Sequence, residues 1–155
     1  MSEKRELIHG TCVAFGPHAA LLLGAPGSGK SDLALRFLAL PPEGEHGPML
    51  VADDQVFVKA RGTALFASVP PTIAGKFEVR GIGIIDMTHV TGAELVLAVD
   101  LVPSQDVPRM PPERLEQTVI AGISIPRIAL APFEVSAPLK LKLALFRAVQ
   151  DRRGA

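Results

Sequence analysis

Residues 24–31 carry glycines, a lysine and a serine at a spacing that binds phosphate. The segment reads Gly-Ala-Pro-Gly-Ser-Gly-Lys-Ser and fits the pattern G-x-x-x-x-G-K-[ST]. In this pattern the glycines let backbone N–H groups turn towards phosphate oxygens, the lysine reaches the β- and γ-phosphates, and the serine hydroxyl binds Mg²⁺. The pattern predicts a site for ATP and Mg²⁺, and the alternative is a glycine-rich turn without a ligand. The residues predicted to bind the nucleotide are Gly24, Ala25, Pro26, Gly27, Ser28, Gly29, Lys30 and Ser31.

A pair of carboxylates, Asp53 and Asp54, follows the short apolar run Met49–Ala52. An apolar strand that ends in aspartate is how a P-loop enzyme supplies a carboxylate near Mg²⁺. Neighbouring residues in an extended chain point in opposite directions, so the two carboxylates need not face the same site. The pair could divide the roles of base and metal ligand, and the sequence does not decide which aspartate does which. The alternative is a turn at the end of a strand, where aspartate is common.

Three further residues are candidates for the same chemistry. Glu78 and Arg80 stand two positions apart in an extended segment, so their side chains are expected on one face. Together they could serve a metal and a phosphate, but the residues alone favour a solvated ion pair. His9 is of interest because its strand could neighbour the phosphate strand. No metal-ligand spacing links the four histidines, so a zinc site is not proposed.

The elements around the phosphate-binding segment are those that would position it. Residues 18–23 are a short apolar run that predicts a buried strand, and residues 32–40 are helix formers with one apolar face. The loop between them therefore lies at the positive end of a helix, where an anion is stabilised. Strands outnumber helices in the rest of the chain, which predicts a mostly β core. We expect strands at 7–15, 49–52, 56–59, 63–67, 93–101, 116–121 and 124–130, a glycine-bent extended chain at 77–86, and a terminal helix at 138–149.

Whole-chain properties exclude several classes of protein. The 155 residues have a formal net charge of zero, which argues against a broad nucleic-acid surface. Cys12 is the only cysteine, so an intrachain disulfide is impossible, and a reducing cytoplasm is compatible with the sequence. The first residues lack an apolar signal core, and no apolar stretch approaches the roughly 18 residues of a membrane helix. We expect a cytoplasmic protein with neither a nucleic-acid nor a membrane partner.

Four segments in fixed order resemble the catalytic domain of HPr kinase/phosphorylase. They are Ile8–Thr11, the phosphate-binding segment, Val51–Asp54 and Phe77–Asp86, and the last looks like that family's signature E-[IV]-R-G-[LI]-G-I-I. The resemblance covers residues 7–90 well and the remainder loosely, in strand and helix order. It implies a strand-rich α/β (α+β) fold with a P-loop kinase core similar to that of phosphoenolpyruvate carboxykinase, which has a mixed central sheet and few helices.

The resemblance implies an ATP-dependent serine kinase of the bacterial phosphotransferase system, which regulates carbon metabolism. Such a kinase transfers the γ-phosphoryl group of ATP to a serine of the small carrier protein HPr. By position, the resemblance implies that Asp53 is the base on the serine hydroxyl, with His9 beside it, and that Arg80 helps to hold the active site. It also implies a homo-oligomer, a hexamer, in which the terminal helix docks a neighbouring subunit or HPr; the alternative is a helix that only covers the sheet. The metal ligands expected are Ser31, Asp54 and Glu78.

The chain departs from the family pattern at several places. Full-length members carry an N-terminal domain, whereas this chain begins at the catalytic domain and resembles the short alphaproteobacterial form. We expect one domain, residues 1–155, without an N-terminal regulatory domain. Asp32 stands where the family usually has Glu, Gly75 to Phe77 lack a histidine before the signature, and residues 125–134 lack a P-x-R-P-G-R-N-like stretch.

The last of these departures bears on the reaction, because in the family that stretch is linked to phosphorolysis of the seryl phosphate. We therefore expect kinase activity and leave phosphorylase activity open. Two rival hypotheses are a P-loop kinase of another protein or small molecule, and an ATP-binding sensor that transfers nothing.

Overall fold

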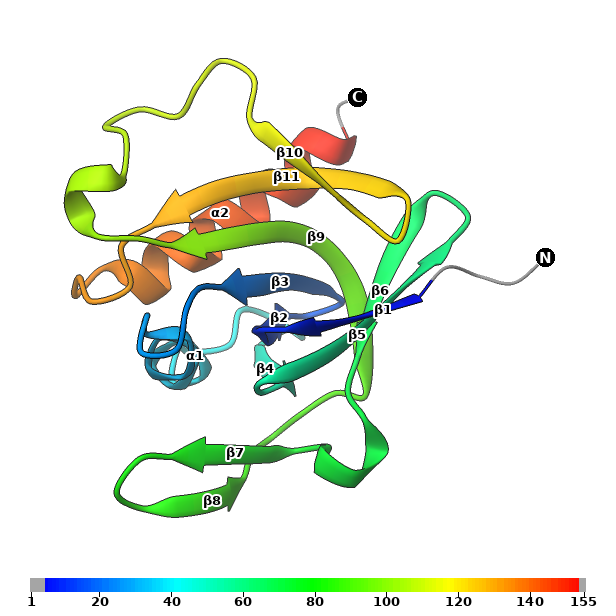
Figure 1. Cartoon of the computed structure of the whole chain (residues 1–155), viewed down its shortest axis with the longest axis vertical. Coiled ribbons are helices and arrows are strands. Elements are labelled where there is room, and N and C mark those ends of the chain that lie inside the picture. Colours follow the sequence, from blue (N-terminus) through cyan, green and yellow to red (C-terminus); the bar gives the residue numbers. More distant parts are fainter. Residues whose placement is uncertain (1–4, 154–155) are drawn as a thin grey trace.

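The computed structural model describes residues 5–153 as a curled sheet with two α-helices and a separate hairpin (Figure 1). The strands are β1 (Arg5–His9), β2 (Thr11–Phe15), β3 (His18–Leu23), β4 (Pro48–Ala52), β5 (Gln55–Arg61), β6 (Ala64–Ser68), β7 (Lys76–Val79), β8 (Gly83–Asp86), β9 (Gly92–Leu101), β10 (Glu116–Ile120) and β11 (Ile123–Leu130). The helices are α1 (Lys30–Leu38), α2 (Ala137–Arg153) and the short 3-10 helices η1 (Pro71–Ile73) and η2 (Ser104–Asp106). The expected excess of strands over helices is confirmed.

The main sheet is mixed, as expected, and β9 is its centre. Its strand order is β1-β5-β6-β9-β3-β2-β4, with β11 also paired to β9 and β10 paired to β11. Strand β9 runs parallel to β3 and β11, whereas it is antiparallel to β6. Strands β6 and β11 pair with different halves of β9, so the sheet curls where the two partners diverge. The carboxyl ends of the three parallel strands β3, β9 and β11 therefore lie at the same edge of the sheet.

Both faces of the sheet are buried, which explains why its central strands are continuous apolar runs. In β3, Ala20 and Leu22 pack on the side of the two α-helices, while Ala19 and Leu21 pack on the opposite side. The core on the helix side includes Val13, Leu22, Leu33, Phe37, Val96, Leu141 and Leu145. The core on the other side includes Leu21, Val58, Leu65, Leu95 and Ile125. Within residues 5–153 no helix is both long and apolar enough to cross a membrane.

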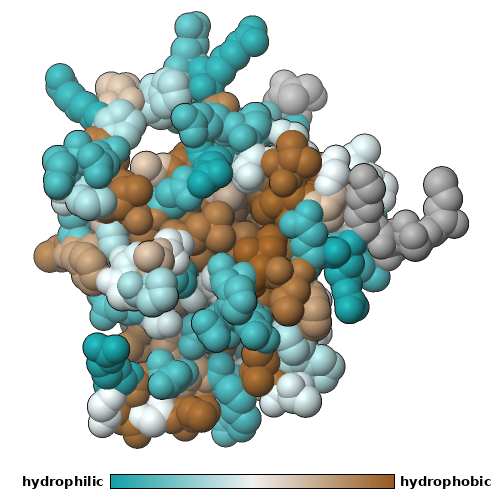
Figure 2. Space-filling model, viewed as in Figure 1, coloured by the Kyte–Doolittle hydropathy of each residue, from teal (hydrophilic) through white to brown (hydrophobic). Residues whose placement is uncertain are grey.

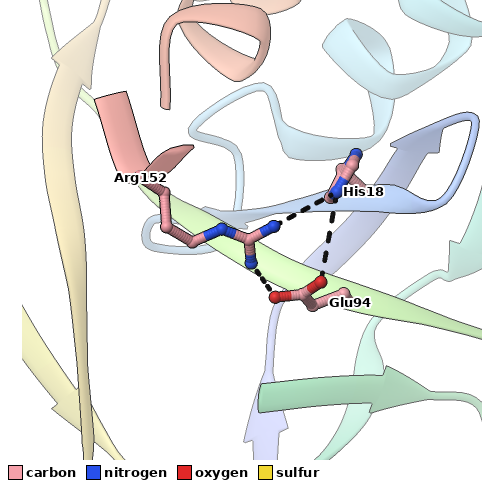
Figure 3. A network of polar contacts seen from close by, with 3 residues as sticks. All are labelled: His18, Glu94 and Arg152. Atoms are coloured by element: carbon pink, nitrogen blue, oxygen red, sulfur yellow. Dashed lines mark hydrogen bonds and ion pairs between the residues drawn. The ribbon is translucent and has the colours of Figure 1, made fainter. Parts of the chain in front are cut away.

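The end of α2 is tied to the sheet by a polar network (Figure 3). The Arg152 guanidinium forms an ion pair with Glu94 of β9 and lies 3.4 Å from the Nε2 atom of His18 in β3. The same His18 atom is 4.0 Å from a Glu94 carboxylate oxygen. The network joins three elements that the sequence separates by more than fifty residues at each step.

Two expected elements differ from the structure. Residues 7–15 are not one strand, because Gly10 separates β1 from β2. A Cβ atom at Gly10 would lie 2.9 Å from the carbonyl oxygen of Leu22, so only glycine permits this approach. Residues 77–86 form the β7–β8 hairpin rather than one bent strand. As a result Glu78 lies in β7 and Arg80 in the turn that follows it, so the prediction that both stand in one extended segment is wrong.

The buried thiol of Cys12 gives a prediction for the fold. Cys12 is fully buried in β2, and burial raises the pKa of its thiol. The thiol of the unfolded chain ionises from about pH 8.5, while the native thiol stays protonated, so rising pH favours unfolding. Above that pH we expect the stability of the wild type to fall relative to Cys12→Ala by about 1.4 kcal/mol per pH unit. Urea unfolding of both proteins between pH 8 and 10 measures their free energies of unfolding. The same dependence of this free energy on pH in both proteins would contradict the expectation.

Candidate functional site

The phosphate-binding segment forms the connection between β3 and α1, so the predicted strand–loop–helix context is confirmed. Gly27 and Gly29 have φ angles of 82° and 102°, in the left-handed region that glycine adopts most readily. Gly29 caps α1, and its carbonyl accepts a hydrogen bond of 2.9 Å from the N–H of Leu33. The first N–H groups of the helix are therefore directed at the loop, which is an arrangement that binds anions.

Two polar side chains show that the loop fits a phosphate ligand. Among the described residues, the Ser28 Oγ atom is buried without a hydrogen-bond partner. The Lys30 ammonium donates to the carbonyls of Gly24, at 2.6 Å, and Ala25, at 3.2 Å. An unpaired buried hydroxyl is costly, and an ammonium folded over the loop supplies the positive charge that a phosphate needs. The loop therefore has both a spare donor and a cation.

The shape of the loop leads to a prediction for Gly24. A Cβ atom there would lie 2.3 Å from Ser28 Oγ and 2.8 Å from Ser28 Cβ, so Gly24→Ala must open the loop. We expect MgATP to bind about 5- to 150-fold more weakly, because overpacking of this kind costs about 1–3 kcal/mol. Gly47→Ala is the matched control, since its Cβ would meet only Pro42, at 3.3 Å. Calorimetric titration compares the two variants, and an unchanged affinity in Gly24→Ala would count against this shape.

Asp53 is the centre of the polar contacts beside the loop. Its Oδ1 atom accepts hydrogen bonds from the hydroxyls of Ser31, at 3.0 Å, and Thr11, at 3.2 Å. Its Oδ2 atom accepts a longer bond, 3.4 Å, from the backbone N–H of Glu78. The carboxylate thus joins α1, β2 and β7. The structure brings Asp53 and Ser31 together, as the sequence reasoning requires.

The side chains of the other candidate residues form no hydrogen bond with the Asp53 carboxylate. Asp54 has a φ of 75°, and its carbonyl accepts a hydrogen bond from Gly10 at the β1–β2 junction. His9 is paired with Gln55 in the β1–β5 register, next to the aspartates. The side chains of His9, Asp54, Glu78 and Arg80 are exposed and form no hydrogen bond or ion pair with the described residues. They are available to ligands from solvent.

The described residues contain no cluster of three or more His, Cys, Asp or Glu side chains that could hold a metal by themselves. Mg²⁺ needs no such cluster, because it keeps several waters and is bound by one or two carboxylates together with substrate phosphates. The Ser31 hydroxyl and the exposed carboxylates of Asp54 and Glu78 provide protein oxygen atoms of this kind. The donor set fits a metal ion that is completed by the nucleotide.

Sequence reasoning missed two residues of this site. Thr11 is 1% exposed and orients Asp53, although no role in the site was predicted for it. Phe133 lies in the connection between β11 and α2, and a Cβ atom at Gly29 would be 2.9 Å from its ring. A threonine in a buried run was a usable signal for Thr11. The position of Phe133 depends on strand order, which the sequence pattern does not give.

Residues 1–131 match the family model for the HPr Serine kinase C-terminal domain. The chain belongs to this family. The β7–β8 hairpin, which touches Asp53 through Glu78, contains the segment that resembles the signature of the HPr kinases. At the lower end of Figure 2, where this hairpin lies, apolar and hydrophilic side chains mix on the surface. Ile82 and Ile84 of this hairpin are 74% and 73% exposed.

Relatives and a solved structure agree with membership of the HPr serine kinase family. The HPr kinase/phosphorylase of Azoarcus sp. (strain BH72) is 33% identical over 162 aligned residues, which cover 97% of this chain and 49% of that protein. That of Mycoplasmopsis pulmonis (strain UAB CTIP) is 35% identical over 94 residues, 61% of this chain and 28% of that protein. The chain thus spans less than half the length of these curated relatives.

The solved structure is the Hpr(Ser) kinase/phosphatase from Coxiella burnetii. It superposes with a TM-score of 0.78 at 25% identity and covers 96% of this chain and 93% of that one. The strand-rich HPr kinase-like fold with a mixed sheet and few helices, expected from the sequence, is therefore confirmed.

Proposed function

We propose that this chain is the catalytic domain of an ATP-dependent serine kinase that phosphorylates HPr. Family membership and the names of the relatives support the reaction and the substrate. The observation that carries the proposal is the hydrogen bond from Ser31 of the phosphate loop to Asp53, 3.0 Å long. It links the nucleotide site to a carboxylate that is suited to activate an alcohol.

Residues 24–31 bind the triphosphate. Backbone N–H groups at the start of α1 donate to phosphate oxygens, and the Lys30 ammonium moves from the loop carbonyls to the β- and γ-phosphates. Ser31, Asp54 and Glu78 would hold Mg²⁺, which would neutralise charge on the phosphates. These groups position the γ-phosphoryl group and stabilise its charge, which is most of what catalysis of this transfer requires.

Asp53 acts as the base. Two hydroxyls fix its Oδ1 atom, whereas Oδ2 accepts, from the described residues, only the long bond of the Glu78 N–H. The incoming serine therefore gives its proton to Oδ2 as the phosphoryl group is transferred in line. His9 stands beside the aspartates and tunes or orients Asp53, and Arg80 at the hairpin turn helps to hold the reacting groups.

The quaternary structure and location are parts of the same proposal. Helix α2 exposes Leu139, Leu143 and Phe146, which are 49%, 63% and 39% exposed. An apolar stripe of this kind supports a homo-oligomer, and the family resemblance supports a hexamer. HPr as substrate and a single reduced cysteine support the cytoplasm. The direction proposed is that of the kinase.

A phosphate-transfer assay tests the proposal. The protein is incubated with γ-labelled MgATP and purified HPr, or with HPr in which the target serine is replaced by alanine. The expected result is label on the first HPr and none on the second. Label on the alanine variant, or on other added proteins or small molecules only, identifies a kinase of different specificity. Saturable binding of ATP without any transfer identifies a sensor and contradicts the proposal.

A further inference from the structure

An exposed aromatic ring lies against the phosphate loop. A Cβ atom at Gly29 would be 2.9 Å from Cζ and 3.1 Å from Cε1 of Phe133, so one edge of the ring touches the start of α1. The side chain is nevertheless 69% exposed. A large apolar ring that is mostly in water beside an anion site contributes little to the core. Its position calls for a ligand rather than a packing role.

The loop that carries this ring is held firmly. Arg36 of α1 donates to the backbone carbonyls of Pro132 and Glu134, the latter at 3.2 Å. The same guanidinium is paired with Asp32, at 2.9 Å, which fixes its direction. The Glu134 carboxylate in turn accepts a bond of 3.1 Å from Lys140. Phe133 is therefore flanked by two carbonyls that are anchored to the helix following the phosphate loop.

The strand order explains why these two segments meet. Strands β3 and β11 both run parallel to β9, so the connections that follow them leave the same edge of the sheet. The phosphate loop follows β3, and the Phe133 connection follows β11. In Figure 1 both connections lie on the left side of the molecule. In α/β sheets ligands bind outside the carboxyl ends of parallel strands, where such connections converge.

We propose that Phe133 forms a stacking platform for the heteroaromatic base of the nucleotide whose phosphates bind residues 24–31. This inference rests on the proposed function, since it needs a nucleotide in the phosphate loop. A phenyl ring offers a face and no hydrogen bonds, so it favours large planar bases by area alone. The subsite therefore prefers purine to pyrimidine triphosphates and discriminates weakly between adenine and guanine.

The test separates the contribution of the base to binding from that of the phosphates. Binding of MgATP and of inorganic tripolyphosphate with Mg²⁺ is measured by calorimetry for the wild type, Phe133→Ala and Val135→Ala. Base stacking contributes a factor of about 5 to 150 in affinity, so Phe133→Ala should lose this factor for ATP and keep its affinity for tripolyphosphate. Val135, in the same connection and 97% exposed, is the matched control, and its removal should change neither.

A second variant reports on the ring directly. The chain contains no tryptophan and no tyrosine, so Phe133→Trp places a single fluorophore at the subsite. We expect ATP to quench its emission and tripolyphosphate to leave it nearly unchanged. We also expect this variant to bind ATP as tightly as the wild type, because indole stacks at least as well as phenyl.

Four results would overturn the inference. Equal losses for ATP and tripolyphosphate in Phe133→Ala would mean that the ring only shapes the loop. Unchanged ATP affinity in that variant would mean that no base stacks there. If Phe133→Ala changes the oligomeric state seen by sedimentation and does not weaken ATP binding more than tripolyphosphate binding, the ring belongs to an interface between proteins. If the wild type binds neither ligand, the proposed function itself fails, and the subsite fails with it.

Discussion

Replacing Asp53 with asparagine is expected to lower the rate of phosphoryl transfer to HPr by on the order of 10² or more. The amide oxygen of asparagine can still accept the hydrogen bonds of Ser31 and Thr11, so the site should keep its shape. It cannot take a proton from a serine hydroxyl. The affinity for MgATP should therefore change little. Calorimetry gives the affinity, and transfer of label to HPr gives the rate.

Asp54→Asn is the matched control for this experiment. Asp54 is exposed, and its side chain makes no hydrogen bond with the described residues, so its loss should not disturb the loop. If Asp54 is a metal ligand, the variant should need more Mg²⁺ for the same rate and recover at high Mg²⁺ concentration. Equal losses of ATP affinity and rate in Asp53→Asn would contradict its assignment as the base. Rescue of Asp53→Asn by Mg²⁺ would exchange the roles of the two aspartates.

Replacing Lys30 with alanine is expected to weaken MgATP binding and slow transfer together. A charge-assisted hydrogen bond contributes about 1.5–3 kcal/mol, so the affinity should fall about 10- to 150-fold. The rate of transfer should fall further than the affinity, because the charge on the γ-phosphoryl group grows in the transition state. The stability of the fold should hardly change, because the hydrogen bonds of the Lys30 ammonium within the described residues go to the exposed carbonyls of Gly24 and Ala25.

Arg147→Ala controls for the loss of one surface cation. Arg147 lies on α2, is 72% exposed at its side chain and pairs only with Asp151 among the described residues. This variant should bind ATP and transfer phosphate like the wild type. Chemical unfolding of both variants checks that neither has lost its structure. A Lys30→Ala protein with normal ATP affinity would mean that the nucleotide binds elsewhere.

Local patterns predicted the parts of this fold that local physics decides. The phosphate loop, its strand and its helix were predictable because glycines, lysine and serine at fixed spacing leave one arrangement. The β5–β6 hairpin was predictable from Arg61-Gly62 between two apolar strands. The break at Gly10 was not predictable, because its cause is the carbonyl of Leu22, which reaches Gly10 only after β2 and β3 have paired.

The candidate site also contains residues that local sequence predicts and residues that only the fold brings into place. Asp53 was predictable because an aspartate after an apolar strand is the usual partner of a phosphate-loop serine, and the 3.0 Å contact with Ser31 agrees. Glu78 reaches Asp53 through its backbone N–H rather than its carboxylate, a detail that only the β7–β8 hairpin defines. Phe133 depends on the parallel pairing of β9 with both β3 and β11, which joins residues about a hundred positions apart.

A single-turnover experiment tests most directly whether this loop and Asp53 together phosphorylate a serine. A limiting amount of γ-labelled MgATP is first bound to an excess of the protein. The complex is then mixed with HPr, and the products are followed by rapid quenching and mass spectrometry. The expected result is one phosphoryl group on one serine of each modified HPr, formed at the rate at which ATP disappears. Loss of ATP to free phosphate with HPr unmodified, or label on a residue other than serine, would contradict it.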